Sequence, residues 1–214
     1  VGPPPRRPLH VAWAAATRAD CRPDPRAADV TEGGDVGETL RRRRTIYAGR
    51  VLTLHVDDVV LADGTPAVRE IVDHRGSVVV VPILGNDVVL VRQGRYAVSR
   101  SLLELPAGTR EAGEAEADCA ARELAEETGY RPDHLEDLGS YYPSPGYTTE
   151  GMHFFLARRL VPAARTPDAD ERIEVVAMPL ATAFHRARTG GFRDLKTTAG
   201  LLLVAARQGP APSE

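Results

Sequence analysis

The acidic side chains between Gly108 and Tyr130 are the residues of this chain best suited to chemistry. Seven carboxylates lie in this segment, and three of them crowd into the stretch RELAEETG as Glu123, Glu126 and Glu127. Such a group can form the solvated face of a helix, or it can bind a hard divalent cation such as Mg²⁺, which takes oxygen ligands. Clustering of charge alone supports both interpretations equally.

A helix must position these three glutamates. We expect it to begin near Gly113, to carry Glu114 and Glu116 in its first turn, and to end at Gly129 in a left-handed cap. The three glutamates then lie in the last turns, where the helix dipole disfavours each negative charge by roughly 0.3–1 kcal/mol. At about 100° per residue they share one face, while Leu124 and its apolar neighbours form another that can pack on a sheet.

The spacing of particular residue types favours the metal site. Gly108 is followed after five residues by Glu114 and after seven more by Arg122, which opens RELAEETGY. This pattern resembles the Nudix box, G-x5-E-x7-R-E-U-x-E-E-x-G-U with U apolar or aromatic, at every fixed position. The resemblance implies a hydrolase of nucleoside diphosphates linked to another group. It also implies an α/β/α sandwich with a mixed sheet, in which the box forms a loop, a helix and a loop.

The segments around the box resemble the ADP-ribose pyrophosphatase subfamily. The similar stretches are REIVDHRGSVVVVPIL and VRQGRYAVSRSLLELPAG before the box, and SPGYTTE and GFRDLKTTAGLLL after it. Members cleave ADP-ribose to AMP and ribose 5-phosphate. Many are homodimers that exchange N-terminal strands, here residues 45–76. The expected partners are a small nucleoside diphosphate substrate and a second copy of the chain, and neither nucleic acid nor a membrane.

The resemblance also implies roles for the residues of the box. Mg²⁺, with Mn²⁺ as a possible substitute, is the implied cofactor. Its main ligands would be Glu123 and Glu127, helped by the backbone carbonyl of Ala107. Glu126 and Glu114 would complete or orient the metal shell, and Arg122 would hold the glutamates by ion pairs.

Outside the box, the resemblance implies a general base and contacts to the substrate. Glu150, in SPGYTTE, is the expected base, and the acidic stretch 168–174 and Glu126 are alternatives. Arg95 would clamp a phosphate or the terminal ribose. Glu104 and Arg100 are weaker candidates for substrate contact, and a structural salt bridge is an equal alternative for each.

One departure from the family pattern leaves the substrate open. Family members commonly have an aromatic or apolar residue where this chain has Gly94. Another nucleoside diphosphate sugar or a dinucleotide is therefore an alternative substrate. A sensor domain without activity is a third hypothesis, but that class tolerates loss of box glutamates, and all of them are present here.

The bulk composition indicates an ordinary globular protein. The chain has 214 residues, of which 43% are hydrophobic and 27% charged, and its net charge of −3 argues against a dedicated nucleic-acid binder. Cys21 and Cys119 form no zinc or disulfide pattern, so a reducing cytoplasm is the expected location. No apolar run approaches the roughly 20 residues of a membrane helix.

Four segments follow from the patterning along the chain. Residues 1–44, rich in Pro and Arg, are predicted to be a disordered extension that closes on the run Arg41–Arg44. Residues 45–76 are predicted to form antiparallel strands with a turn at Asp63–Gly64. Residues 77–208 form the predicted Nudix hydrolase domain, with a central hairpin in 77–93 and helices in 181–191 and 194–208. A tail covers 209–214. The mixture predicts an α/β (α+β) fold.

Overall fold

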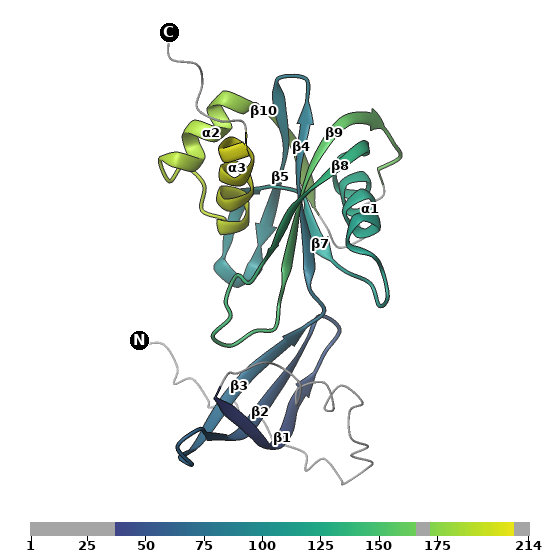
Figure 1. The fold of residues 1–214 in the computed structure, drawn as a ribbon. Helices are drawn as coiled ribbons and strands as arrows, with labels where there is room; N and C mark the ends of the chain where they lie inside the picture. The colour runs from purple at the N-terminus through teal and green to yellow at the C-terminus, as the bar shows by residue number, and fades with distance from the viewer. Residues whose placement is uncertain (1–36, 166–171, 208–214) are drawn as a thin grey trace, which may run out of the picture.

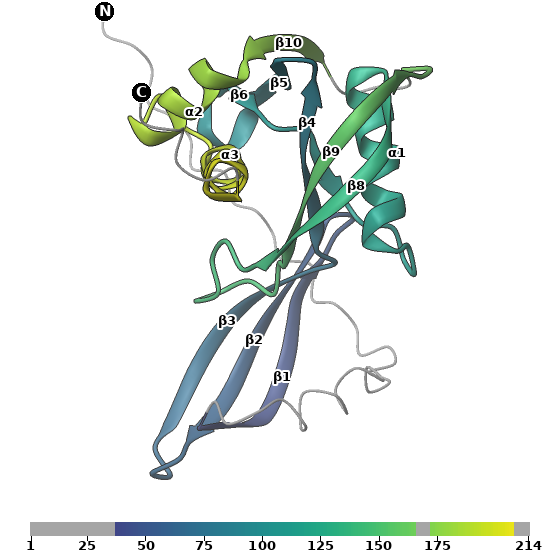
Figure 2. The same cartoon turned by 45° about the horizontal axis from the view of Figure 1, so that its top comes forward.

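The computed structural model describes residues 37–165 and 172–207, and these residues form two sheets and three helices (Figure 1). The N-terminal sheet has three antiparallel strands, β1 (Glu38–Ala48), β2 (Leu52–Leu61) and β3 (Pro66–His74). It projects from a larger body in both views of the ribbon (Figures 1 and 2). The predicted tail 209–214 lies outside the described residues.

The first strand begins earlier than the sequence indicates. β1 starts at Glu38, so the boundary that we placed at residue 44 falls inside a strand. The reason is cross-strand pairing of charge. Arg43 donates to both carboxylate oxygens of Asp57 at 2.9 and 2.7 Å, and Arg42 donates to Asp58 at 2.8 Å. The predicted disorder of residues 1–36 lies outside the described residues.

The larger body is built on a seven-stranded mixed sheet. Its main path runs β10–β5–β4–β9–β8, with β6 pairing β5 and β7 pairing β4. Only the β4–β9 pair is parallel. The strands are β4 (Ser77–Leu84), β5 (Asp87–Arg95), β6 (Arg100–Glu104), β7 (Ala107–Thr109), β8 (Tyr130–Tyr141), β9 (Met152–Pro162) and β10 (Ile173–Pro179). The apolar runs of β4 and β5 form the predicted hairpin and lie at the centre of the sheet, as continuously buried strands require.

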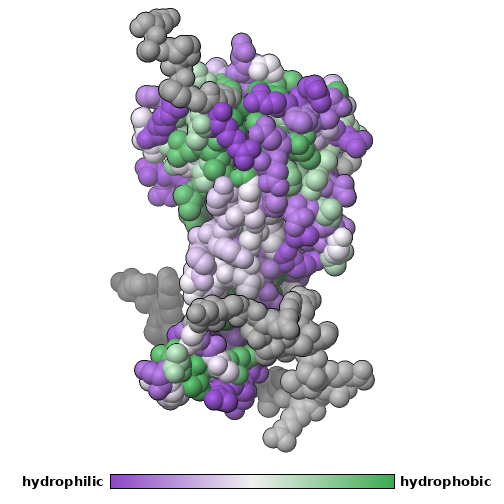
Figure 3. All heavy atoms as spheres, viewed as in Figure 1, coloured by the Kyte–Doolittle hydropathy of each residue, from purple (hydrophilic) through white to green (hydrophobic). Residues whose placement is uncertain are grey.

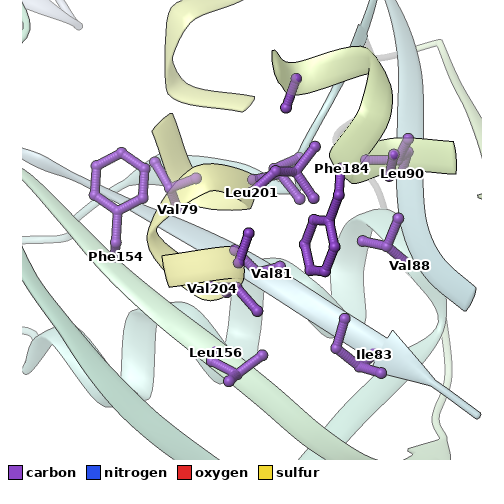
Figure 4. Close-up of a cluster of buried hydrophobic side chains, with 14 of the residues drawn as sticks. Val79, Val81, Ile83, Val88, Leu90, Phe154, Leu156, Phe184, Leu201 and Val204 are labelled. Carbon is purple, nitrogen blue, oxygen red and sulfur yellow. The ribbon is translucent and has the colours of Figure 1, made fainter. Parts of the chain in front are cut away.

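Helices cover both faces of this sheet, which confirms the predicted α/β/α sandwich. α2 (Leu180–Arg188) and α3 (Leu195–Arg207) lie on one side, and α1 (Glu116–Thr128) lies on the other (Figure 2). The larger cluster of buried side chains joins the α2–α3 side to the sheet through Val81, Leu90, Phe154 and Leu201 (Figure 4). A smaller cluster packs Leu124 of α1 on the opposite face.

The strands β6, β7 and β8 were not predicted. β8 contains Pro132 and Gly139, residues that weaken a strand pattern, and it pairs only with β9 at the margin of the sheet. A bulge between Asp137 and Gly139 accommodates the glycine, whose φ is 101°.

Within the described ranges, every helix is too short or too polar to cross a bilayer.

Candidate active site

Helix α1 places the glutamates close to their expected positions. It ends at Thr128, and Gly129 caps it in the left-handed conformation with a φ of 77°, as predicted. The start differs, because Ala115 is the N-cap and the first turn carries Glu116 and Asp118. Glu114 therefore lies in the preceding loop.

Arg122 is the hub of this acidic cluster. Its guanidinium donates to both carboxylate oxygens of Glu114 at 2.8 and 2.9 Å, to Glu123 at 2.8 Å and to Glu126 at 2.9 Å. These hydrogen bonds lower the pKa of the Glu114 carboxyl to about 2 and raise the pKa of Arg122. One arginine thus holds three carboxylates of like charge around the end of the box loop.

The lowered pKa of Glu114 predicts a dependence of stability on acid. A carboxyl whose pKa is depressed on folding stabilises the protein above its unfolded pKa, and this contribution is lost as the pH falls through the folded value. We therefore expect the urea midpoint of the wild type to fall between about pH 4.5 and pH 2 partly through Glu114. Glu114→Gln should show a smaller fall over that window. An identical pH profile for the two proteins would contradict this account.

Two glutamates of α1 converge on the backbone at Ala107–Gly108. Glu127 is 3% exposed, and its carboxylate accepts the Ala107 N–H at 3.2 Å. A Cβ atom placed on Gly108 would lie 1.9 Å from the Cδ of Glu123, so the carboxylate of Glu123 lies directly against this glycine. A side chain at position 108 would therefore have to displace the carboxylate of Glu123.

This donor set fits a hard divalent cation. Oxygen atoms of carboxylates and of a neighbouring backbone segment are the ligands that Mg²⁺ prefers. Within residues 37–165 and 172–207, no three acidic, histidine or cysteine side chains are grouped so that they could hold a metal ion as they stand. Three of the four box carboxylates instead accept hydrogen bonds from Arg122. The fourth, that of Glu127, accepts the backbone N–H of Ala107.

Substituting Gly108 should test the close approach of Glu123. We expect Gly108→Ala to displace this carboxylate and to reduce hydrolysis strongly, with a loss of stability on the order of 1–3 kcal/mol from overpacking. Gly94→Ala is a matched control, because a Cβ atom at Gly94 meets nothing within 4 Å. Thermal melting and activity of both variants should be compared. Equal behaviour of the two would mean that Glu123 is free to move aside.

A cavity of about 820 Å³ adjoins this acidic cluster and is large enough for a nucleotide-sized ligand. Ala107 and Gly108 line it, together with Arg95 and Glu150. One wall is apolar and comes from α3, through Leu195, Ala199, Leu202, Leu203 and Ala206. The buried residues of α3 are Thr197, Gly200, Leu201, Val204 and Ala205, and Ala199 and Leu203 contact both this core and the cavity. Hydrophobic residues interrupt the hydrophilic surface on the side of α2 and α3 (Figure 3).

Glu150 enters the cavity from the loop between β8 and β9. Its Oε1 accepts a hydrogen bond from the Ser77 hydroxyl at 2.9 Å, and the Nδ1 of His74 lies 3.9 Å away. The loop itself is tied to the end of β3. Val72 donates to the Tyr147 carbonyl at 2.7 Å and accepts the Thr149 N–H at 3.0 Å.

The side chain of Thr149 completes this attachment. Its hydroxyl donates to Asp73 at 2.9 Å and accepts the backbone N–H of His74, also at 2.9 Å. The N-terminal sheet therefore helps to set the position of Glu150.

Arg95 and Glu104 form an ion pair beside the cavity. Arg95 donates to both carboxylate oxygens of Glu104 at 2.9 and 2.7 Å. Glu104 is 1% exposed and also pairs with Lys196, which lies 3.1 Å from Asp194. Burial alone would raise the pKa of Glu104, but hydrogen bonds and the nearby positive charges outweigh it, so the pKa lies below its ordinary value.

Two other positions singled out in the sequence lie elsewhere. Arg100 is exposed at the start of β6, opposite Arg95 in the strand pairing, and lies outside the cavity. Gly94 lines a separate hollow, together with Arg92 and Arg165. Ser77, Asp194 and Lys196 line the cavity but were not selected from the sequence. The one signal that could have indicated Lys196 is that it is the only lysine of the chain.

The fold and this site define the class of protein. The model of the NUDIX domain matches residues 73–199, and the chain belongs to the Nudix family. The matched range covers the mixed sheet, the acidic helix and the first residues of α3.

The chain is similar in sequence to two pyrophosphatases and to an activator of methanol dehydrogenase. The chain is 37% identical to the ADP-ribose pyrophosphatase of Bacillus subtilis (strain 168), over 72% of this chain and 85% of that protein. It is 39% identical to the methanol dehydrogenase activator of Bacillus methanolicus, over 75% and 88% of the two chains. It is 37% identical to the GDP-mannose pyrophosphatase of Cronobacter sakazakii (strain ATCC BAA-894), over 60% and 73%.

A solved structure agrees with the fold. The crystal structure of an ADP compounds hydrolase superposes with a TM-score of 0.72 at 25% identity, covering 81% of this chain and 97% of that one. The chain is thus a Nudix pyrophosphatase, similar to proteins that act on several nucleotide compounds.

Proposed function

We propose that this enzyme hydrolyses ADP-ribose to AMP and ribose 5-phosphate. The observation that carries the proposal is the convergence of Glu123 and Glu127 on Ala107–Gly108, at the margin of a cavity that also contains Arg95 and Glu150. The similarity to ADP-ribose pyrophosphatases over most of the chain supports this substrate.

The box would hold the divalent cation. Glu123 and Glu127 would be the main ligands, with the Ala107 carbonyl, and Glu126 and Glu114 would complete or orient the shell. When bound, Mg²⁺ neutralises the diphosphate and polarises its oxygens. Arg122 keeps the carboxylates close together despite their mutual repulsion, since it donates to three of them.

Residues outside the box would bind the substrate and move the proton. A water molecule attacks one phosphorus, the bond from that phosphorus to the bridging oxygen breaks, and Glu150 takes the proton of the water. The Ser77 hydroxyl donates to one oxygen of Glu150 and thereby orients this carboxylate. Arg95, whose side chain is 39% exposed beside the cavity, would donate to the substrate with the edge that does not face Glu104.

A substrate panel tests the proposal. The protein should be incubated with Mg²⁺ and ADP-ribose, other nucleoside diphosphate sugars and dinucleotides, and ranked by kcat/KM. We expect ADP-ribose to rank first and to yield AMP. Hydrolysis in ¹⁸O water shows which product gains the oxygen. Cleavage of another diphosphate without turnover of ADP-ribose would reject the substrate and retain the reaction class.

Another nucleoside diphosphate sugar is the second candidate substrate. The similarity to a GDP-mannose pyrophosphatase favours this alternative. Gly94, where the sequence departs from the subfamily pattern, lies outside the cavity, so we attribute selectivity within one chain to other residues.

We also propose that the enzyme works as a homodimer joined through its N-terminal strands. The three-stranded sheet and its first turn carry exposed apolar side chains, namely Ile46, Tyr47, Val51 and Val68 at 44 to 58% exposure. Such side chains are typical of a surface that a partner covers. Light scattering after size exclusion should give twice the chain mass, and a monomer at micromolar concentration would contradict the proposal.

A further inference from the structure

Lys196 stands out because of its residue type. Lysine and arginine together number 27, and Lys196 is the only lysine, so arginine fills every other basic position. Lys196 lies in the first turn of α3, and its side chain is only 11% exposed. It lines the cavity next to Asp194.

The geometry around Lys196 suits a compact ammonium group. The group lies between two carboxylates, pairing with Glu104 and lying 3.1 Å from Asp194. An ammonium has three N–H donors, so one remains for the cavity after each carboxylate accepts one. A planar guanidinium is larger and presents its donors as a fixed fork, so an arginine at this position would not offer three donors from a single small group.

Neighbouring residues hold both carboxylates in place. Asp194 caps α3 by accepting the backbone N–H of Thr197 at 2.9 Å and its hydroxyl at 2.5 Å. The Thr197 hydroxyl in turn accepts the N–H of Leu105 at 2.8 Å, in the buried interior. Glu104 precedes Leu105 directly and is bound by Arg95. The position of the ammonium is therefore determined by α3 and β6 together.

This network is electrically balanced. Two cations, Arg95 and Lys196, face two anions, Glu104 and Asp194, so this wall carries no net positive charge for a second phosphate group. It combines N–H donors with carboxylate acceptors, and this combination matches hydroxyl groups, which both donate and accept hydrogen bonds. An uncharged polyol is the ligand that such a wall would recognise.

We propose that Lys196 and Asp194 bind the hydroxyl groups of the terminal sugar and so determine which diphosphate compounds the enzyme selects. This inference rests on the proposed function, because it takes the ligand to be a nucleoside diphosphate sugar. The diphosphate lies toward Ala107–Gly108 and Glu150, and the sugar lies against the first turn of α3.

A binding comparison with two ligands tests the proposal without turnover. Isothermal titration in EDTA should compare ADP-ribose with the methyl ester of ADP, which keeps the diphosphate and lacks the sugar. We expect the wild type to bind ADP-ribose more tightly. Lys196→Met should weaken ADP-ribose binding by roughly tenfold to a hundredfold, as expected for a lost hydrogen bond from a charged donor, and should leave the methyl ester within about twofold.

Two further variants keep the test decisive. Arg207→Met is the matched control, because it removes an exposed cation of α3 that pairs with Glu136 away from the cavity, and it should change neither affinity. Lys196→Arg keeps a cation paired with Glu104 and should still lose the preference for ADP-ribose. This variant replaces Lys196→Met in the test if the methionine variant fails to fold.

Several results would overturn the proposal. These are an equal loss of affinity for both ligands, retention of the preference in Lys196→Arg, or a wild type without preference for ADP-ribose. The substrate panel remains independent, since a protein that binds ADP-ribose in this way but hydrolyses another diphosphate rejects the proposed function and keeps the sugar site.

Discussion

Replacing Glu127 with Gln should lower kcat by more than about a hundredfold. Partners that merely orient a metal ligand typically contribute tenfold to a hundredfold in affinity or activity, so a ligand itself should contribute more. Glu127 is 3% exposed and bonded to the Ala107 N–H. Glutamine has nearly the same shape and lacks the charge, so the fold should persist while cation binding is lost.

The measurement is the Mg²⁺ dependence of hydrolysis, followed together with thermal melting. Glu116→Gln provides the matched control, because Glu116 belongs to the same helix, is 39% exposed and pairs with Arg110. We expect wild-type activity from this control. A Glu127→Gln variant with unchanged kcat and an unchanged requirement for Mg²⁺ would mean that Glu127 has only a structural role.

Replacing Glu150 with Gln should lower kcat by roughly 10²–10⁴-fold, the usual contribution of a general base. The expected change in KM is small, because this carboxylate would accept a proton from water rather than hold the substrate. Wild-type kcat in this variant would show that the base lies elsewhere.

Two further variants test how Glu150 is oriented and whether Glu126 is the base instead. Ser77→Ala should reduce kcat less than Glu150→Gln, because it removes the hydrogen bond that orients the carboxylate and not the carboxylate itself. Glu126→Gln tests the alternative base within the box. Its carboxylate pairs with Arg122 at 2.9 Å, so a loss mainly in Mg²⁺ affinity would assign it to the metal shell.

The sequence predicts most accurately where the determinants are local. The helix with its glycine cap and the central hairpin follow from periodicity, because residues close together along the chain decide them. The α/β/α sandwich was implied by the resemblance of one short motif to a known family. The start of β1 was wrong because its arginines find their aspartates only across a strand pair.

The remainder of the candidate site depends on contacts between distant segments. Ser77 meets Glu150 across 73 positions, and Lys196 meets Glu104 across 92. No local pattern marks such pairs, and a lone serine or lysine has many ordinary roles. The apolar cavity wall on α3 was also not predictable from local spacing. Leu195 and Leu202 have the helical spacing of core residues, yet they line the cavity.

The attachment of the Glu150 loop to β3 has a consequence for self-association. β3 is an edge strand of the N-terminal sheet, and an unpaired edge offers backbone groups on which another chain can form a strand. Val72 bonds to the loop through both its N–H and its carbonyl, which covers the end of this edge. Shortening the loop would therefore remove the proposed base and, at the same time, expose a site for aggregation.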